Sequence, residues 1–447
     1  MQPETEDQRS IENLRALIRI PTVSRLDESE IDWEHFETFR DELAKRYPKM
    51  HSALDLELVD GHSMLFRWHG SLEGEPTVLM AHYDVVPATS AGWEHPPFAA
   101  ELVGASGDQF VWGRGTLDDK GSLVSILEGV EARVADGFVP AHDVYLSFGH
   151  NEETAGTGAQ VIVDLLESRG VRPALVLDEG GAVVEGIFPG VTGPIAVVGV
   201  SEKGILSLRL IVEQQGGHAS TPPKLAATVR LARAIVRLNR RPFRKSFVST
   251  NLEMIRTLGA HARQPLKWVF TNLWLTKLPL LGIFARMSDE TNAMVRTTQA
   301  VTQLSGAQAA NALAERAEAI VNIRIAIDST VDEATAHVRR AIRDDAVRIE
   351  ALHPTEPSPV SPTSGNAWEL VKATIEETYQ GTIVTPYVML GASDSRHFSR
   401  ISDHVYRFSP FEMSSAERGT LHAKNERIRV STFLKGIDFY RRLIGTL

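Results

Sequence analysis

Three apolar stretches that end at histidine or acidic side chains constrain the fold of this chain more than any other feature. They read TVLMAHYD (77–84), DVYLSFGHNEE (143–153) and ALVLDEGG (174–181). Runs that are apolar on both faces are typical of strands buried inside a parallel sheet. Residues 119–135 and 158–168 lie between them and have helical periodicity. The β–α–β–α–β order predicts an α/β fold, with a mostly parallel sheet flanked by helices.

The pattern changes after about residue 199. Residues 204–214 and 317–328 alternate apolar and polar side chains, as strands with one solvent-facing side do. A chain of 447 residues also exceeds what one hydrophobic core usually organises. We therefore expect an inserted α+β domain at 199–355, and a larger domain formed by 1–198 together with 356–447.

Composition excludes several classes of function. The net charge of −10, with basic residues scattered along the chain, argues against nucleic-acid binding. The absence of cysteine excludes disulfides and thiolate metal sites, and it fits a reducing compartment. The polar, acidic N-terminus lacks the order of a signal peptide, and no stretch of about 18 uncharged apolar residues predicts a transmembrane segment. We expect a cytoplasmic protein, with a leader lost from the given sequence as the alternative.

One segment of the expected insert, residues 262–287 (ARQPLKWVFTNLWLTKLPLLGIFARM), is unusually rich in Trp, Phe and Leu. Lys267, Lys277 and Arg286 interrupt it, which argues against a membrane span. It can form the core of the insert or a subunit interface. Alternatively, it can cover an apolar substrate group or contact a membrane surface.

Imidazoles and carboxylates gather where the apolar stretches end. On a strand, residues i and i+2 point to the same side, so His82 and Asp84 face the same way. A carboxylate beside a metal-binding imidazole fixes its tautomer, whereas a buried His–Asp hydrogen bond would be purely structural. Imidazole and carboxylate ligands without thiolates are typical of one or two zinc-like ions that hold a hydrolytic water.

Two acidic pairs add to this set. Asp118 and Asp119 follow the glycines of GRGTLDDKG (113–121) at an expected helix start, where Asp118 could bridge two metals or cap the helix. Glu152 and Glu153 adjoin at the end of an apolar strand, where they repel each other unless a cation or proton compensates. One can bind a metal while the other acts as general base, and a solvated pair is the alternative. With His82, these pairs favour a metal-dependent amide hydrolase.

Three further segments offer candidate groups. Either Asp178 or Glu179 can supply another ligand, depending on where the preceding strand stops. His218 lies in the glycine-flanked stretch GGHAS of the expected insert. A surface histidine is the ordinary expectation there, but a hinged lid could deliver it to an oxyanion. His422 stands alone before the last expected helix.

The motifs of the chain, taken in order, read LMAHYDVVP, GWEHPPF, WGRGTLDDKGS, GHNEETAGTGA, LDEGG, VSEKG and GGHAS. This series resembles the M20 family of di-zinc metallopeptidases, within it the branch of carboxypeptidase S (Gly-X carboxypeptidase) and N-fatty-acyl-amino-acid synthase/hydrolase. The resemblance covers nearly the whole chain. It implies a zinc-peptidase-like catalytic domain, an inserted lid and dimerisation domain, and a homodimer. It also implies two zinc ions per chain, with cobalt or manganese as other possible ions.

The resemblance further implies a ligand set. His82 would bind one zinc and Glu153 the other, with Asp118 bridging the two ions. An acid of the 178–179 pair would join the first ion, and His422 would join the second. The peptide bond after the bridging aspartate would be cis.

Catalytic and substrate-binding roles are implied in the same way. Asp84 would orient the histidine ligand before it, and Glu152 would be the general base. His218 would reach across a dimer interface into the partner's active site. Asn311 and Arg396 resemble the family's substrate-binding residues, the arginine grasping a free carboxylate. The flank of Asn311 reads Ala-Leu-Ala, where relatives have Val-Ile-Pro.

Two substrate classes fit these expectations. The first is N-acyl amino acids with an apolar acyl group, which the apolar segment 262–287 favours, and their hydrolysis would be reversible. The second is short peptides that release a C-terminal amino acid, as a carboxypeptidase or dipeptidase does. A dimeric metal- or ligand-binding protein without catalysis is the alternative of another class. Glu152 argues against it, because a binding protein needs the ligands and not the base.

Overall fold

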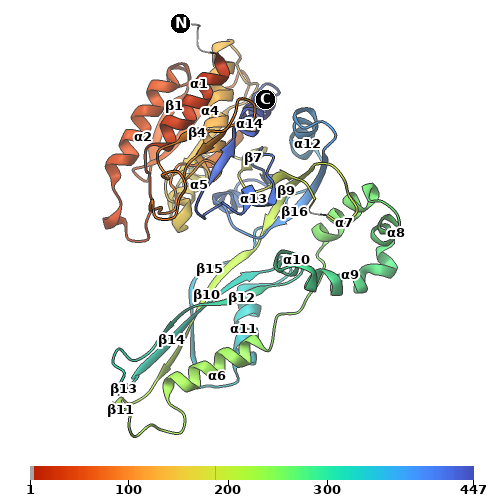
Figure 1. Cartoon of the computed structure of the whole chain (residues 1–447). Coiled ribbons are helices and arrows are strands. Elements are labelled where there is room, and N and C mark those ends of the chain that lie inside the picture. Colours follow the sequence, from red (N-terminus) through yellow and green to blue (C-terminus); the bar gives the residue numbers. More distant parts are fainter. Residues whose placement is uncertain (1–4, 187) are drawn as a thin grey trace.

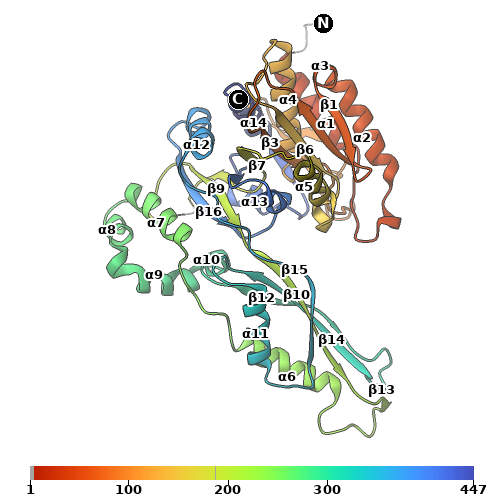
Figure 2. The same cartoon turned by 180° about the vertical axis from the view of Figure 1, so that it is seen from behind.

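The computed structural model describes residues 5–186 and 188–447. It has two parts, a large body in which helices surround a sheet and a slender second sheet that extends away from that body (Figures 1 and 2). Within the described residues, no helix is both long enough and apolar enough to cross a membrane.

The described residues of the large body form a nine-stranded central sheet. Its strands lie in the order β1 (Asp55–Val59), β2 (Ser63–Trp68), β6 (Val144–Gly149), β3 (Thr77–His82), β7 (Leu175–Asp178), β17 (Val405–Arg407), β9 (Ile195–Glu202) and β16 (Ile383–Met389), with β8 (Ala182–Val184) beside β9. The strands from β6 to β17 run parallel, as do β9 and β16, whereas β1, β2 and β8 pair antiparallel with their neighbours. The predicted α/β fold with a mostly parallel sheet is confirmed.

Helices cover both faces of this sheet. One face packs against α1 (Glu6–Ile18), α2 (Trp33–Arg46), α3 (Pro48–Ala53), α4 (Lys120–Ala135), α12 (Asn366–Thr378) and α14 (Val430–Ile444), and the other against α5 (Gly158–Ser168) and the 3-10 helix η3 (Asp394–Arg400). Strand β3 shows why its sequence is continuously apolar. Leu79 and Ala81 enter the core on the first face, while Val78 and Met80 enter the core on the second, because successive side chains of a strand alternate.

Smaller elements complete the large body. They are a three-stranded sheet of β4 (Glu101–Val103), β5 (Phe110–Trp112) and β18 (Arg427–Arg429), the 3-10 helices η1 (Glu28–Glu30) and η2 (Glu152–Thr154), and α13 (Ser415–Arg418).

The slender part is an antiparallel sheet with its own core. Its strands lie in the order β12 (Thr298–Ser305), β14 (Arg316–Ile325), β10 (Gly204–Glu213) and β15 (Arg348–Thr355), and α6 (Ala227–Asn239) and α11 (Val331–Ile342) pack on it. Alternate residues of β10, such as Leu206 and Leu208, face these helices. The short pair β11 (Gly217–His218) and β13 (Ala312–Leu313) forms the tip far from the large body (Figure 1).

Four helices inside the 199–355 stretch pack on the large body instead of the slender sheet. They are α7 (Ser249–His261), α8 (Leu266–Thr271), α9 (Leu273–Met287) and α10 (Asp289–Met294). Ile255, Phe270 and Phe284 from these helices join the core of the large body. The stretch for which the sequence predicts a single inserted domain is therefore divided between two hydrophobic cores.

Candidate metal centre

The parallel strands bring polar side chains together at one edge of the large sheet. Strands β6, β3 and β7 are neighbours that run in the same direction, so their carboxyl ends meet. His82 is the last residue of β3, and Glu179 directly follows β7. Glu153 lies in η2, four residues after the end of β6, and Asp118 precedes α4.

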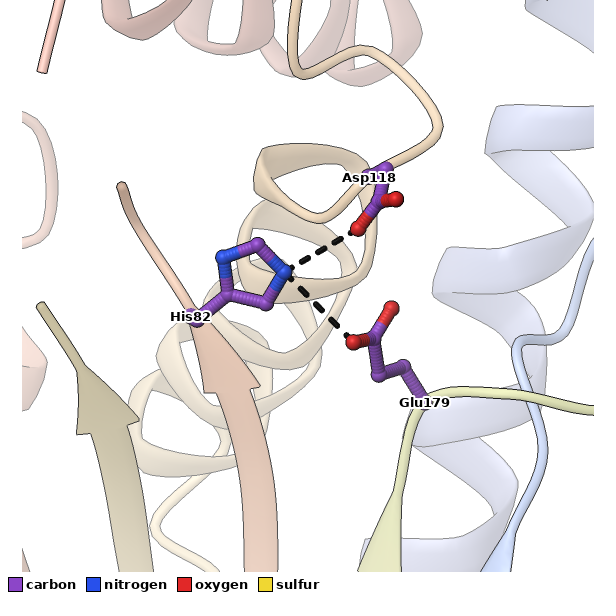
Figure 3. Close-up of side chains that lie close together, drawn as sticks. All are labelled: His82, Asp118 and Glu179. Carbon is purple, nitrogen blue, oxygen red and sulfur yellow. Dashed lines mark hydrogen bonds and ion pairs between the residues drawn. The ribbon is translucent and has the colours of Figure 1, made fainter. Parts of the chain in front are cut away.

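These side chains form two groups of three that share one carboxylate. In the first, His82 Nε2 lies 3.0 Å from Asp118 Oδ1 and 3.5 Å from Glu179 Oε1 (Figure 3). In the second, His422 Nε2 lies 2.9 Å from Asp118 Oδ2 and 2.9 Å from Glu153 Oε2. Within each group the possible ligand atoms lie within 4.8 Å of one another.

The donor set fits two divalent metal ions. Each group combines one imidazole nitrogen with carboxylate oxygens, which zinc accepts readily. Asp118 presents a different oxygen to each histidine, as a bridging carboxylate must. Oε1 of Glu153 is buried and has no hydrogen-bond partner among the described residues. A buried carboxylate oxygen without a donor is stabilised by a cation.

The electrostatics of the cluster are those of acids crowded around histidines. Burial raises the pKa of Glu179 to about 8, and nearby Asp118 adds to the shift. Hydrogen bonds to Asp118 and Glu153 raise the pKa of His422 to about 10. Burial acts to lower the pKa of His82, but Asp118, Asp84 and Glu179 outweigh it and hold that pKa well above the usual value. The cluster therefore favours positive charge at its centre, which a metal ion can supply.

Asp84 links the end of β3 to η2, the 3-10 helix that follows β6. Its Oδ1 lies 3.2 Å from His82 Nδ1, and its backbone carbonyl oxygen lies 3.0 Å from the same nitrogen. Its carboxylate also accepts hydrogen bonds from the backbone N–H groups of Glu152 and Glu153, each at 3.2 Å. Asp84 thus contacts the imidazole at the nitrogen opposite to the candidate metal ligand atom, the contact that the expected orienting role requires.

Of the two acids left open by the sequence, Glu179 lies in the cluster and Asp178 does not. Oδ2 of Asp178 accepts a hydrogen bond of 2.9 Å from the backbone N–H of Ser395. Strand β7 ends at Asp178, so the next side chain, that of Glu179, turns toward His82. Asp178 therefore supports η3, which begins at Asp394, rather than a metal site.

Glu426 is a buried residue that the sequence reasoning missed. It accepts hydrogen bonds from the backbone N–H groups of Gly115 (3.1 Å), Leu117 (2.9 Å) and Asp118 (3.3 Å). It also pairs with the buried guanidinium of Arg114. Because Glu426 follows His422 by four residues, one carboxylate ties the loop of Asp118 to the segment of His422. The Asp118–Asp119 peptide bond in that loop is cis, as the resemblance implies.

His218 and Asn311 lie far from the metal centre of their own chain. Both are exposed at the tip of the slender sheet, where the backbone N–H of Ala219 donates to the carbonyl of Asn311 at 3.0 Å. Nδ1 of His218 contacts the hydroxyl of Ser220 at 2.7 Å. In both views the tip lies at the far end of the slender sheet, well away from β7 in the large body (Figures 1 and 2). Within one chain, His218 and Asn311 therefore lie near each other and away from the metal centre.

Arg396 lies on η3 among further charged residues near the site. Its positive charge acts to lower the pKa of Asp394, of Glu202 and of Arg324 on β14. Asp394 is buried, and burial raises its pKa to about 7. The sequence reasoning missed Asp394 and Arg324. Asp394 stands two residues before Arg396 in GASDSRHF, but Arg324 is one of several polar residues on an alternating strand and carries no such local signal.

Known proteins resemble this chain along nearly its whole length. The sequence pattern that defines peptidase family M20/M25/M40 matches residues 78–446. The chain is 37% identical over 447 residues to the N-fatty-acyl-amino acid synthase/hydrolase PM20D1 of Xenopus tropicalis, covering 99% of this chain and 86% of that protein. It is 34% identical over 415 residues to the probable carboxypeptidase S-like 2 of Dictyostelium discoideum, covering 92% and 79% respectively.

A solved structure has the same fold. The M20 family metallo-carboxypeptidase Sso-CP2 from Sulfolobus solfataricus is similar with a TM-score of 0.70, over 98% of each chain. Sequence identity is 16%, so this likeness concerns the fold alone.

Proposed function

Because this chain belongs to peptidase family M20/M25/M40 and is a hydrolase of amide bonds, we propose that it cleaves N-acyl amino acids with an apolar acyl group. One observation carries the proposal. Two groups of candidate metal ligands share Asp118, and Glu152 lies beside them without belonging to either. The similarity to the synthase/hydrolase over 99% of the chain supports the substrate class.

We propose two zinc ions per chain, with cobalt or manganese as possible replacements. The ligands would be His82, Asp118 and Glu179 for the first ion, and Asp118, Glu153 and His422 for the second. Bound there, such ions polarise the amide carbonyl and make a water molecule acidic near neutral pH.

Glu152 is the proposed general base. Its backbone N–H donates a hydrogen bond to the carboxylate of Asp84. Burial raises the pKa of the Glu152 carboxyl well above the usual value. Glu152 accepts the proton of the attacking water, keeps it while the tetrahedral species exists, and donates it to the leaving amine nitrogen. A carboxyl group placed beside the attacking water can hold the proton between the two transfers.

In the proposed homodimer, the partner subunit supplies the hydrogen-bond donor to the oxyanion. His218 of the partner subunit would donate a hydrogen bond to the oxyanion that forms from the amide carbonyl. The strand order supports a second copy, because β12 has a free outer edge among the described strands and exposes Val301 and Leu304. Unpaired edge strands of this kind are suited to continuing a sheet into another subunit.

Arg396 is the proposed contact for the free carboxylate of the amino acid. Asn311 is the proposed second substrate contact and, because it lies at the tip with His218, it would come from the partner subunit. A guanidinium presents a planar fork that matches a carboxylate with two hydrogen bonds. Both substrate classes carry this carboxylate, so Arg396 serves either of them. We further propose a cytoplasmic location, which the absence of cysteine supports.

The test is hydrolysis of N-acyl amino acids of increasing acyl length beside blocked dipeptides, by the wild type and by Glu152→Gln, with and without a chelator. We expect hydrolysis that requires metal and is lowered about 10²–10⁴-fold in Glu152→Gln, with metal content unchanged. Glu153→Gln is the matched control at the neighbouring position, and it should lose metal as well as activity. Full activity of Glu152→Gln, or of the metal-free protein, would contradict the proposal.

Release of C-terminal amino acids from short peptides is the second candidate function. The similarity to the carboxypeptidase S-like protein favours it, and the proposed site does not distinguish an acyl group from a peptide on the amine. The same substrate panel decides between them. A kcat/KM that rises with acyl length supports N-acyl amino acids, and a preference for blocked dipeptides supports the carboxypeptidase.

A further inference from the structure

Helices α8 and α9 expose a dense group of large apolar side chains. The exposed fractions are 51% for Trp268, 84% for Trp274, 53% for Leu275, 77% for Leu278, 54% for Ile283 and 46% for Met287. We call these six residues the α8–α9 apolar surface. The other exposed large apolar residues of the described chain are scattered, so this concentration within twenty positions distinguishes the surface.

Helix α9 is also apolar on the side that faces the large body. Leu273, Leu280 and Phe284 of α9 are buried in the core of the large body. A helix that is apolar all round is normally enclosed by protein or by lipid. Here the inner side is enclosed by protein, while Trp274 and Leu278 on the outer side face solvent. The outer side therefore has the composition of a surface that meets an apolar partner.

The charge of this segment identifies the partner. Residues 254–288 contain no aspartate or glutamate, although the whole chain has a net charge of −10. The segment contains five basic residues, Arg256, Arg263, Lys267, Lys277 and Arg286. All but Lys277 are exposed. The segment that carries the apolar surface is thus positively charged between Glu253 and Asp289, in an otherwise acidic protein.

A second copy of the chain fits this charge poorly. In a two-fold interface the same patch meets itself, so Lys267 and Arg286 would face like charges across the contact. An anionic lipid surface complements both properties, because basic side chains contact its headgroups while Trp and Leu enter the boundary of the acyl chains. Tryptophan is also favoured at that boundary.

We propose that the α8–α9 apolar surface docks on anionic lipid, with Trp274 and Leu278 inserted and Lys267 and the neighbouring arginines on the headgroups. The next helix, α10, contacts the segment that precedes His422. Glu290 of α10 pairs at 3.6 Å with Arg418, which precedes His422 by four residues. If the proposed substrates are correct, docking brings the metal centre to a lipid surface in which their acyl chains dissolve. Only this consequence rests on the proposed function.

The first experiment is flotation of the full-length protein with vesicles of phosphatidylcholine, with or without phosphatidylglycerol. We expect binding to the anionic vesicles and weaker binding to the neutral ones. The double variant Trp274→Gln/Leu278→Gln should bind the anionic vesicles at least about 10-fold less, since it removes the inserted side chains. Leu26→Gln/Leu72→Gln is the matched control, because these leucines are 89% and 63% exposed elsewhere and should not affect binding.

The second experiment separates charge from apolar contact. Each basic residue near an anionic leaflet strengthens binding about fivefold, so Lys267→Gln should weaken binding to anionic vesicles by that factor and leave neutral vesicles unaffected. Exposed Lys49, on α3, is the control position for the same substitution.

Three outcomes would overturn the proposal. Failure of the wild type to bind anionic vesicles would remove lipid as the occupant. Binding of the double variant equal to that of the wild type would do the same. A change in the oligomeric state of Trp274→Gln/Leu278→Gln by light scattering would instead make this face a contact between copies. Hydrolysis of a short-chain, water-soluble substrate without vesicles tests the proposed function separately, so the two proposals can fail independently.

Discussion

The metal centre and the tip of the slender sheet differ in how completely one chain builds them. At the metal centre, His82, Asp118 and Glu179 are brought within contact distance by neighbouring parallel strands and a buried loop. At the tip, His218 and Asn311 are exposed, and the hydrogen bonds described for them stay within the tip. The first region is assembled by folding, whereas the role proposed for the second requires another surface.

Substitutions in the two regions should therefore differ in their effects on metal binding, stability and activity. A change at the metal centre disturbs buried charges that compensate one another, so it should affect metal binding, stability and activity together. A change at the tip removes an exposed group, so it should affect activity and leave stability and metal content as they were.

The largest expected effect is the loss of the shared carboxylate. Asp118→Asn replaces the one side chain that belongs to both ligand groups. We expect hydrolysis to fall to background and both metal ions to be lost, measured by activity and by elemental analysis of the purified protein. Glu57→Gln, an exposed acid on β1, is the control. Retention of two ions with near wild-type activity would show that Asp118 does not bridge.

His218→Ala should have the next largest effect. Removal of an oxyanion donor lowers kcat about 10²–10³-fold, and the metal content should not change because the tip contacts no ligand of its own chain. A mixture of inactive His218→Ala and inactive Glu152→Gln then tests action across the dimer. Exchange of subunits should restore about a quarter of the wild-type activity, because one site of each mixed dimer has both groups intact. No recovery in proven mixed dimers would contradict the arrangement.

Glu426→Gln should weaken metal binding without removing a ligand. The substitution loosens the loop of Asp118 and leaves the guanidinium of Arg114 without its charged partner. We expect metal affinity to fall about 10–100-fold, with a loss of about 3 kcal/mol in the free energy of unfolding. Glu417→Gln is a matched control, since Glu417 is a buried acid of the same segment that pairs with Arg429. Equal effects of both variants on metal affinity would remove the special role of Glu426.

The smallest expected effect on stability belongs to Asn311→Ala. The side chain is exposed at the tip, so the free energy of unfolding should change by no more than about 0.5 kcal/mol. The expected change is a higher KM for substrates with a free carboxylate, measured beside thermal unfolding. A large loss of stability would show that the tip is not an independent, exposed region.

Much of the metal centre can be predicted from the sequence because its ligands follow local signals. His82 and Glu153 each follow an apolar run that specifies a buried strand, and such runs can be recognised without knowledge of the rest of the chain. The choice of Glu179 over Asp178 cannot be predicted in this way. It depends on where β7 stops, and β7 pairs with β17 more than two hundred residues later in the chain.

Other features were missed for similar reasons. The bonds of Glu426 join residues about three hundred positions apart, and no periodicity reports such a contact. The helices α7 to α10 contain a stretch that is apolar on all sides, so no period shows which face is buried or against which sheet it packs. Tertiary packing decides both features.

The shared carboxylate of Asp118 has a thermodynamic consequence. Its two oxygens belong to different ligand groups, so an ion entering one group changes the orientation and the charge of a ligand of the other. Occupation of the two positions is therefore linked: each ion alters the affinity for the other by the same factor. A calorimetric titration of the metal-free protein should follow one coupled isotherm rather than two independent ones.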